Sequence, residues 1–306
     1  MSDSEKKSSK SPDESPSFTK KQTFFRRLFS TLGLWGFVGA AFWFNNAWLW
    51  VFLFGAVSVG GLIEYFQLFP GRGFKRFRWH CCFLALVYVG GLFAEGLGFK
   101  PPWKIADLDG FVVAMLIIGV VLARLRRPLE GLRTLEEIAV SVFGFFYIVL
   151  LFGFSAKILL LPLDENEGSS HFYLLYLLAV TKFTDMGAYS IGSLIGRDKM
   201  VPHVSPGKTW QGFGGAIFAA FVASFGCLWL IGDKIPLITP LHAALLSVAL
   251  ALVAVLGDLA ESILKRSLQA KDSGHLIPGI GGILDLIDSI LFTAPILYFY
   301  LQLLSR

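Results

Sequence analysis

Apolar runs long enough to cross a membrane recur along the chain after its first two dozen residues. A helix rises 1.5 Å per residue, so it needs about 20 apolar residues to span the hydrocarbon core. Nine such runs can be recognised, at approximately 29–44, 47–69, 81–98, 108–123, 137–160, 171–192, 212–231, 239–257 and 289–303. Charged residues make up only 16% of the chain, below the roughly 25% of a soluble domain. The sequence therefore predicts an all-α, polytopic integral membrane protein with about nine transmembrane helices.

The first 22 residues differ sharply from the rest. They are rich in Ser, Lys, Asp, Glu and Pro and contain one aromatic residue, so they cannot bury enough apolar surface to fold. No apolar core follows that would make them a signal peptide. We expect three parts: a disordered cytoplasmic tail at 1–22, N-terminal transmembrane helices at 23–170 and a C-terminal transmembrane region at 171–306, to which the motifs described below assign catalysis.

The basic residues predict the orientation. Most of the 27 Lys and Arg residues fall in the tail and in every second loop after it, including "GRGFKRFRW", "RLRRPLEGLR" and the stretch from Arg197 to Lys208. By the positive-inside rule these segments are cytoplasmic, which predicts a multi-pass protein of the cell inner (plasma) membrane. Anionic lipid headgroups account for the net charge of +5, so no nucleic-acid partner is expected.

Ionisable residues enter the predicted spans in four places. Glu64 ends the second span, Lys182 and Asp185 lie in the sixth, and two further clusters flank the last cytoplasmic loop. These two clusters are a stripe at the end of the eighth span (Asp258, Glu261, Ser262 and Lys265) and a pair at the start of the ninth (Asp285 and Asp288). Such residues are costly in a bilayer and commonly mark function. The alternative is that each reaches the interface as a helix end.

The carboxylates of the last two clusters predict a metal site. Asp258, Asp285 and Asp288 flank one short loop, and carboxylates brought together repel one another unless a cation lies between them. Oxygen ligands that are completed by phosphates favour Mg²⁺.

A second polar loop, residues 195–216, is expected on the same side of the membrane. Its "SPGKTW" segment, Ser205 to Trp210, presents Lys208 on a glycine turn. This segment is not a P-loop, because residue 202 is proline where the first glycine should be and no strand is expected before it. Lys208, Lys265, Arg266 and Lys271 beside the carboxylates suit phosphoryl or nucleotidyl transfer in a polar funnel that faces the cytoplasm. Gly281 and Gly282 would let the backbone approach phosphates closely.

The run from Ser262 to Asp288 resembles the signature of the phosphatidate cytidylyltransferase (CDP-diglyceride synthetase) family. Eleven signature positions are in register: Ser262, Lys265, Arg266, Lys271, Asp272, Gly274, Pro278, Gly281, Gly282, Asp285 and Asp288. The segments "GDLAES" and "DMGAYSIGSLIGRDKMVPHVSPGKTWQG" are also similar to family segments. Two positions depart from the signature: Ile280 replaces a His and Leu286 replaces an Arg.

The resemblance implies that CTP and phosphatidic acid give CDP-diacylglycerol and pyrophosphate. Its implied catalytic residues are Asp258, Asp285, Asp288, Lys265, Arg266 and Lys271, with Mg²⁺ on the three aspartates. Lys208, Ser205, Asp185, Gly281 and Gly282 would bind the nucleotide and its metal. A second cation, K⁺, and a homodimer are also implied.

Other functions stay open at this point. One is a CTP-dependent lipid kinase of the dolichol kinase type, and another is a cytidylyltransferase acting on a different lipid phosphate. A cation-coupled transporter is disfavoured because the polar clusters crowd to one face. An inactive family member is the remaining alternative, because Ile280 and Leu286 remove polar groups.

Overall fold

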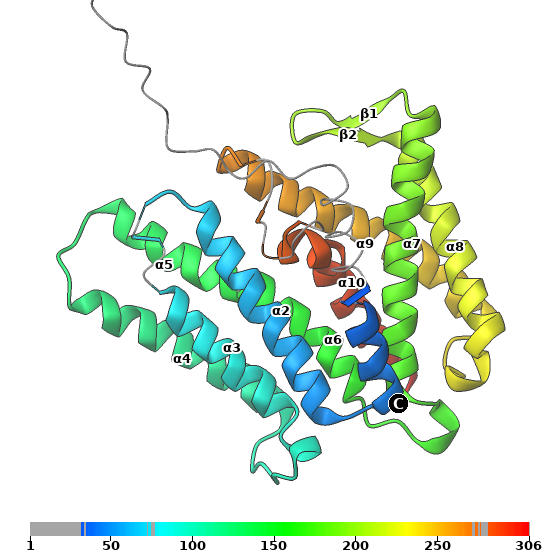
Figure 1. Ribbon diagram of the computed structural model, residues 1–306, viewed down its shortest axis with the longest axis horizontal. Coiled ribbons are helices and arrows are strands. Elements are labelled where there is room, and N and C mark those ends of the chain that lie inside the picture. Colours follow the sequence, from blue (N-terminus) through cyan, green and yellow to red (C-terminus); the bar gives the residue numbers. More distant parts are fainter. Residues whose placement is uncertain are drawn as a thin grey trace, which may run out of the picture.

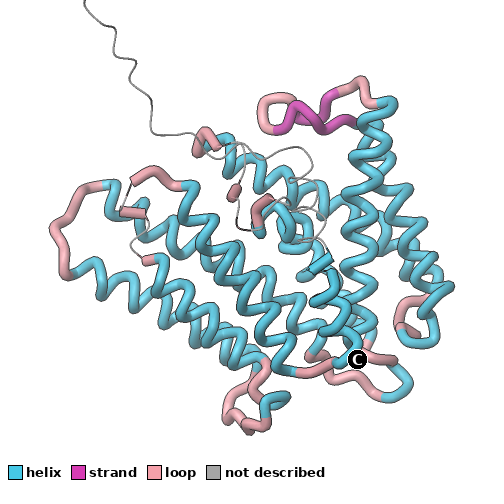
Figure 2. Tube along the Cα trace, in the orientation of Figure 1, coloured by secondary structure: helices cyan, strands magenta, loops and turns pink. Residues whose placement is uncertain are grey.

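The computed structural model describes residues 32–33, 35–71, 73–74, 77–270, 273–274, 276 and 281–305, and these are almost entirely helical (Figures 1 and 2). The predicted tail, 1–22, lies outside the described residues. The N-terminal part contains a helix at Trp35–Phe44 followed by α2 (Ala47–Leu68), α3 (Arg78–Leu92), α4 (Ile105–Leu125), α5 (Leu132–Gly144) and α6 (Leu151–Leu159). A π-helical stretch, Phe145–Leu150, joins α5 to α6 without a break.

The C-terminal part contains four long helices and one hairpin. Its elements are α7 (Ser170–Ile195), β1 (Lys199–Val201), β2 (Ser205–Thr209), α8 (Trp210–Ile231), α9 (Pro240–Ser267) and α10 (Ile283–Leu304). In Figure 1, α2 to α5 lie to the left and α7 and α8 to the right, with α10 in the middle, where it packs against both α6 and α9. Single 3₁₀ turns occur at Glu95–Leu97, Glu165–Glu167 and Gly232–Lys234.

Six of the described helices are long and apolar enough to cross a membrane: Ala47–Leu68, Asp107–Leu125, Leu132–Leu159, Trp210–Lys234, Pro240–Ser267 and Ile283–Leu304. Large apolar side chains along α8, including Phe218, Val222 and Trp229, are exposed, as expected of a lipid-facing surface. The chain is thus an all-α, multi-pass membrane protein. The three other expected spans coincide with Trp35–Phe44 and α3, which are short, and with α7, which carries Lys182 and Asp185. Nine spans therefore remain a prediction.

Side-chain caps explain where several helices begin. Asn46 accepts a hydrogen bond from the Trp48 backbone N–H at 2.8 Å and so caps α2. Thr209 accepts one from Gly212 at 3.1 Å at the start of α8. Thr239, followed by Pro240 in the first turn, caps α9. Each cap satisfies a backbone donor that the helix itself leaves unpaired.

Close helix crossings set the spacing of the C-terminal part. A Cβ atom added at Gly187 in α7 would lie 2.5 Å from the Gly215 carbonyl oxygen in α8. A Cβ atom added at Gly257 in α9 would lie 2.6 Å from the Asp288 carbonyl oxygen in α10. Because any side chain would push these backbones apart, the glycines allow α7 to contact α8 and α9 to contact α10 directly.

The loop at 195–216 forms a structure that the sequence did not predict. We expected no strand before the "SPGKTW" segment, but β1 and β2 pair as an antiparallel hairpin, with Val201 opposite Ser205. The hairpin stands beyond the upper end of α7 in Figure 1 and is the one magenta element of Figure 2. Gln211 supports it by accepting hydrogen bonds from the backbone of Arg197 and Asp198.

Glu64 ties the N-terminal part to the C-terminal loop. Its carboxylate is fully buried and accepts hydrogen bonds from the backbone N–H groups of Leu276, at 3.2 Å, and Leu284, at 2.9 Å. Gly274 and Gly282 lie so close to this carboxylate that a Cβ at either would collide with it. Glu64 is therefore a clamp on the loop before α10 and does not reach an aqueous interface.

We predict that Glu64→Ala destabilises the protein in detergent. Each buried N–H group left without its partner costs about 1–3 kcal/mol, so the apparent Tm should fall by several degrees. The exposed Glu95 in the 95–97 turn is the matched control, and Glu95→Ala should leave the Tm unchanged. Equal Tm values for the two variants would show that Glu64 does not hold the loop.

Candidate functional site

A polar pocket of about 340 Å³ opens where α7, the hairpin, α8 and α9 meet. Four of the residues that the sequence singled out line it: Asp185, Ser205, Lys208 and Asp258. The remainder of its wall includes small residues, such as Gly192, Gly207 and Gly212, which leave room for a ligand. The hairpin and the end of α9 thus lie on the same side of the molecule, as the sequence predicted.

An ion pair joins the hairpin to α9 across this pocket. Lys208 Nζ on β2 lies 2.6 Å from Asp258 Oδ2 on α9. The two side chains retain 20% and 26% of their exposure, respectively, so a ligand in the pocket can reach both. Lys208 is therefore placed to bind phosphate, and its pairing with Asp258 holds the hairpin over the pocket.

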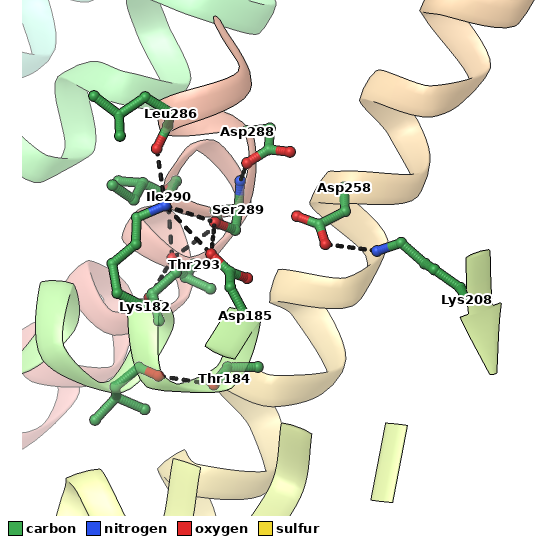
Figure 3. A network of polar contacts seen from close by, with 12 residues as sticks. Lys182, Thr184, Asp185, Lys208, Asp258, Leu286, Asp288, Ser289, Ile290 and Thr293 are labelled. Atoms are coloured by element: carbon green, nitrogen blue, oxygen red, sulfur yellow. Dashed lines mark hydrogen bonds and ion pairs between the residues drawn. The ribbon is translucent and has the colours of Figure 1, made fainter. Parts of the chain in front are cut away.

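Asp288 on α10 faces Asp258 from the other side (Figure 3). Its side chain is only 8% exposed, and it accepts a hydrogen bond from the Ser289 backbone N–H at 2.6 Å. The carboxylates of Asp258, Glu261 and Asp185 repel its charge, and the Lys182 ammonium attracts it without forming an ion pair. Within the part of the chain that the structure describes, no Lys or Arg forms an ion pair with Asp288. Asp288 is thus a buried carboxylate among other carboxylates.

Lys182 and Asp185 form a hydrogen-bonded network with the start of α10 (Figure 3). Lys182 Nζ lies 3.3 Å from Asp185 Oδ2 and donates to the Leu286 carbonyl oxygen at 2.9 Å. Ser289 Oγ donates to Asp185 Oδ2 at 2.9 Å. The network fixes the Asp185 carboxylate at the pocket wall, beside Asp258 and Asp288.

Asp285 belongs to a second, neighbouring cluster. Lys265 Nζ lies 2.8 Å from Asp285 Oδ1 and 2.9 Å from Glu261 Oε2. The other oxygen of Asp285 accepts a hydrogen bond from the Gly282 backbone N–H at 3.2 Å and thereby caps α10. We call Glu261, Lys265, Gly282 and Asp285 the loop cluster. The sequence predicted that Asp258, Asp285 and Asp288 form one group, whereas the carboxylate of Asp285 is engaged in the loop cluster.

The remaining site residues are at the edge of this arrangement. Arg266 is exposed at the end of α9, and Lys271 and Ile280 lie outside the described residues. Gly281 has a φ of +123°, a backbone conformation that glycine adopts readily and other residues rarely do. The side chain of Leu286, which replaces the signature Arg, lines a small apolar cavity together with Ile287, Ile290 and Leu178. This substitution therefore adds packing to the apolar cavity instead of a charge to the pocket.

The donor set fits a magnesium ion held jointly by protein and substrate. No three His, Cys, Asp or Glu residues in the described ranges are grouped as a ready metal site. However, Mg²⁺ in phosphate enzymes is commonly held by one or two carboxylates plus substrate phosphates. Asp258 and Asp288 supply such a pair of carboxylates, and Asp288 is buried without an ion pair to any Lys or Arg among the described residues. Its burial is unfavourable unless a cation joins it.

Reasoning from sequence missed two contributors to the site. Glu261 is 2% exposed and holds Lys265; it was noted in the polar stripe but given no role. Ser289 orients Asp185 and follows Asp288 directly. The i, i+3 spacing from Asp258 to Glu261 was a usable signal for the first, because it places both on one helix face.

The geometry suits transfer chemistry on phosphates. A lysine beside exposed carboxylate oxygens, in a pocket that is partly shielded from water, can neutralise phosphate charge and orient a phosphorus atom. The pocket lies between the hairpin, which carries Lys208, and the apolar helices α7, α8 and α9. A soluble phosphate compound and a membrane lipid could meet there.

Comparison with known proteins identifies the family. Residues 25–304 match the model of the cytidylyltransferase family. An Escherichia coli K12 protein named "Uncharacterized protein YnbB" is 33% identical over 83% of this chain and 80% of its own length. A phosphatidate cytidylyltransferase of Mycobacterium bovis is 37% identical over 71% of both chains, and one of Bacillus subtilis is 36% identical over 64% of this chain and 67% of its own length. The chain therefore belongs to the cytidylyltransferase family, as its sequence motifs indicated.

Proposed function

We propose that this protein is a phosphatidate cytidylyltransferase that converts CTP and phosphatidic acid to CDP-diacylglycerol and pyrophosphate. The observation that carries the proposal is the pocket in which Lys208 contacts Asp258 next to Asp185 and Asp288. Two of the relatives described above carry this name. The family resemblance of the loop before α10 also supports this reaction.

In this mechanism a phosphate oxygen of the lipid attacks the α-phosphorus of CTP. A new bond forms between this oxygen and the α-phosphorus. The bond between the α-phosphorus and the oxygen that bridges the α- and β-phosphates breaks, and pyrophosphate leaves with that electron pair. The lipid phosphate is already an anion, so the attack requires no general base. For this reason the absence of the signature His at position 280 is compatible with activity.

The residues have separate tasks. Lys208 binds the triphosphate, and Ser205 and Gly207 give it space at the hairpin. Lys182 and Ser289 hold Asp185 in place. Lys265 is placed by Glu261 and Asp285 to meet phosphate charge at the loop, with Arg266 and Lys271 as further cations. Gly281 and Gly282 would let the loop backbone approach the phosphates.

Asp258 and Asp288 are the proposed magnesium ligands. The sequence predicted Asp285 as a third ligand, and we keep it in the proposed set. Bound Mg²⁺ would neutralise charge on the triphosphate and on the departing pyrophosphate. The second cation, K⁺, is proposed from the family resemblance alone, as is a homodimer. We also propose that the pocket faces the cytoplasm through a funnel, because the positive-inside rule assigns the basic loops 71–79, 124–133 and 197–208 to the cytoplasmic side.

The proposed reaction predicts which products are formed. Purified protein supplied with phosphatidic acid, Mg²⁺ and CTP should move a label from the cytosine base into lipid. A label in the γ-phosphate should appear in pyrophosphate. γ-Label in lipid would instead identify a lipid kinase, and no transfer to this lipid would redirect the search to other lipid phosphates or to an inactive member.

Asp288→Asn should lower kcat by at least about 100-fold, because electrostatic groups in such sites are commonly worth 10²–10³ in rate. The exposed Asp233, on the turn after α8, is the matched control, and Asp233→Asn should keep full activity. Any residual activity of Asp288→Asn should need a higher Mg²⁺ concentration for half-maximal rate than the unchanged protein does. Unchanged turnover in this variant would remove Asp288 from the site.

Gly257→Ala should also reduce activity, through the geometry of α9 and α10. The new Cβ would collide with the Asp288 backbone, so Asp258 should move away from Asp288 while the helices persist. We expect a loss of about tenfold or more in kcat, since small displacements of reacting groups are costly. Gly226→Ala on α8 is the control, because nothing lies within 4 Å of its Cβ position.

A further inference from the structure

An apolar groove that the polar site does not use runs along α5 and α6. It has a volume of about 590 Å³, within the roughly 300–1,000 Å³ usual for ligand sites. Phe143, Leu150, Leu151 and Phe154 line one wall, and Ala260 and Leu264 of α9 with Phe292 of α10 line the other. From Phe143 to Lys157 the helix rises about 20 Å at 1.5 Å per residue. That length exceeds the roughly 15 Å of one bilayer leaflet.

The groove adjoins the loop cluster and Asp288 through α9 and α10. Ala260 and Leu264 are direct neighbours of Glu261 and Lys265 in the chain, and Phe292 lies one turn after Asp288. The polar pocket is lined by Val255 and Asp258, on the other face of α9. A molecule whose charged end lies at these carboxylates could therefore lay an apolar tail in the groove.

Tyr147 marks the junction between groove and site. Its side chain is 5% exposed and lines the groove, but its hydroxyl has no hydrogen-bond partner among the residues that the structure describes. The hydroxyl is under the electrostatic influence of Glu261, Asp288 and Asp258. Its ring is stacked on Phe143 and packs edge-on against Phe292, so it is held in place. A buried hydroxyl without a partner is unfavourable unless a ligand supplies one.

We propose that this groove holds one acyl chain of the phosphatidic acid substrate and that Tyr147 binds an oxygen of its headgroup region. The inference rests on the function proposed above and names the lipid part of the site. The phenol is an uncharged donor, so it can approach a phosphate or ester oxygen close to carboxylates that would repel the anion. Lys157 and Asp109 form an ion pair at the far end of the groove, and the Tyr88 hydroxyl donates a hydrogen bond to Asp109. The apolar part of the groove ends at this polar group.

The test uses phosphatidic acid with a photoreactive diazirine in one acyl chain, bound to the full-length protein in detergent. Mass spectrometry should place the label within residues 143–154 or at Phe292. Excess phosphatidic acid should compete for the label, whereas phosphatidylcholine should not. Leu151→Trp, which fills the groove, should remove the competed label. Leu245→Trp, at an exposed position of α9 outside the groove, should retain it.

Kinetics of Tyr147→Phe provide the second measurement. Loss of one hydrogen bond from an uncharged donor should raise the KM for phosphatidic acid about five- to tenfold, with the KM for CTP unchanged. Labelling elsewhere, or labelling that Leu151→Trp does not affect, would overturn the groove proposal even if cytidylyl transfer occurs. Competed labelling of the groove in a protein that does not turn over CTP would retain the lipid site but contradict the proposed reaction.

Discussion

Pairing of charges inside an apolar protein is the constraint on which this structure depends. A charged side chain in a bilayer is costly unless it is paired or reaches water. Lys208 with Asp258, Lys182 with Asp185, Lys265 with Asp285 and Lys157 with Asp109 each satisfy this condition. Each pair except Lys182–Asp185 joins different elements, so the pairs that lower the cost of burial also position the hairpin, the loop before α10 and the helices around the pocket. Asp288 has no such pair among the described residues, although the Lys182 charge acts on it, and an added cation would lower the cost of its burial.

Much of the fold could be predicted from apolar run lengths. The runs at 47–69 and 212–231 agree closely with α2 and α8. The run at 239–257 ended ten residues before α9 does, because the helix continues while one face becomes polar. That continuation was still visible in the i, i+3, i+4 spacing from Asp258 to Ser262. The hairpin escaped prediction because its strands, of three and five residues, are too short to show alternation.

The sequence predicted which residues belong to the site but not which of them contact one another. The motifs identified Asp185, Lys208, Asp258 and Asp288, and the structure brings these together. They did not reveal that Asp285 caps its own helix and binds Lys265. Nor could local sequence show that Glu64 binds backbone groups 212 and 220 residues away, because such contacts exist only after α2 packs beside α10. The need for glycine at position 257 is likewise visible only in the fold, because the Asp288 backbone packs directly against Gly257.

The central claim is that CTP phosphates occupy the pocket beside Lys208, and lysine footprinting tests it most directly. The protein in detergent would be treated with an amine-reactive reagent, with and without CTP and Mg²⁺, and the modified lysines quantified by mass spectrometry. We expect CTP to protect Lys208, whereas Lys100, exposed before α4, should react equally in both samples. Saturating CTP that leaves the reactivity of Lys208 unchanged would contradict this placement of the nucleotide.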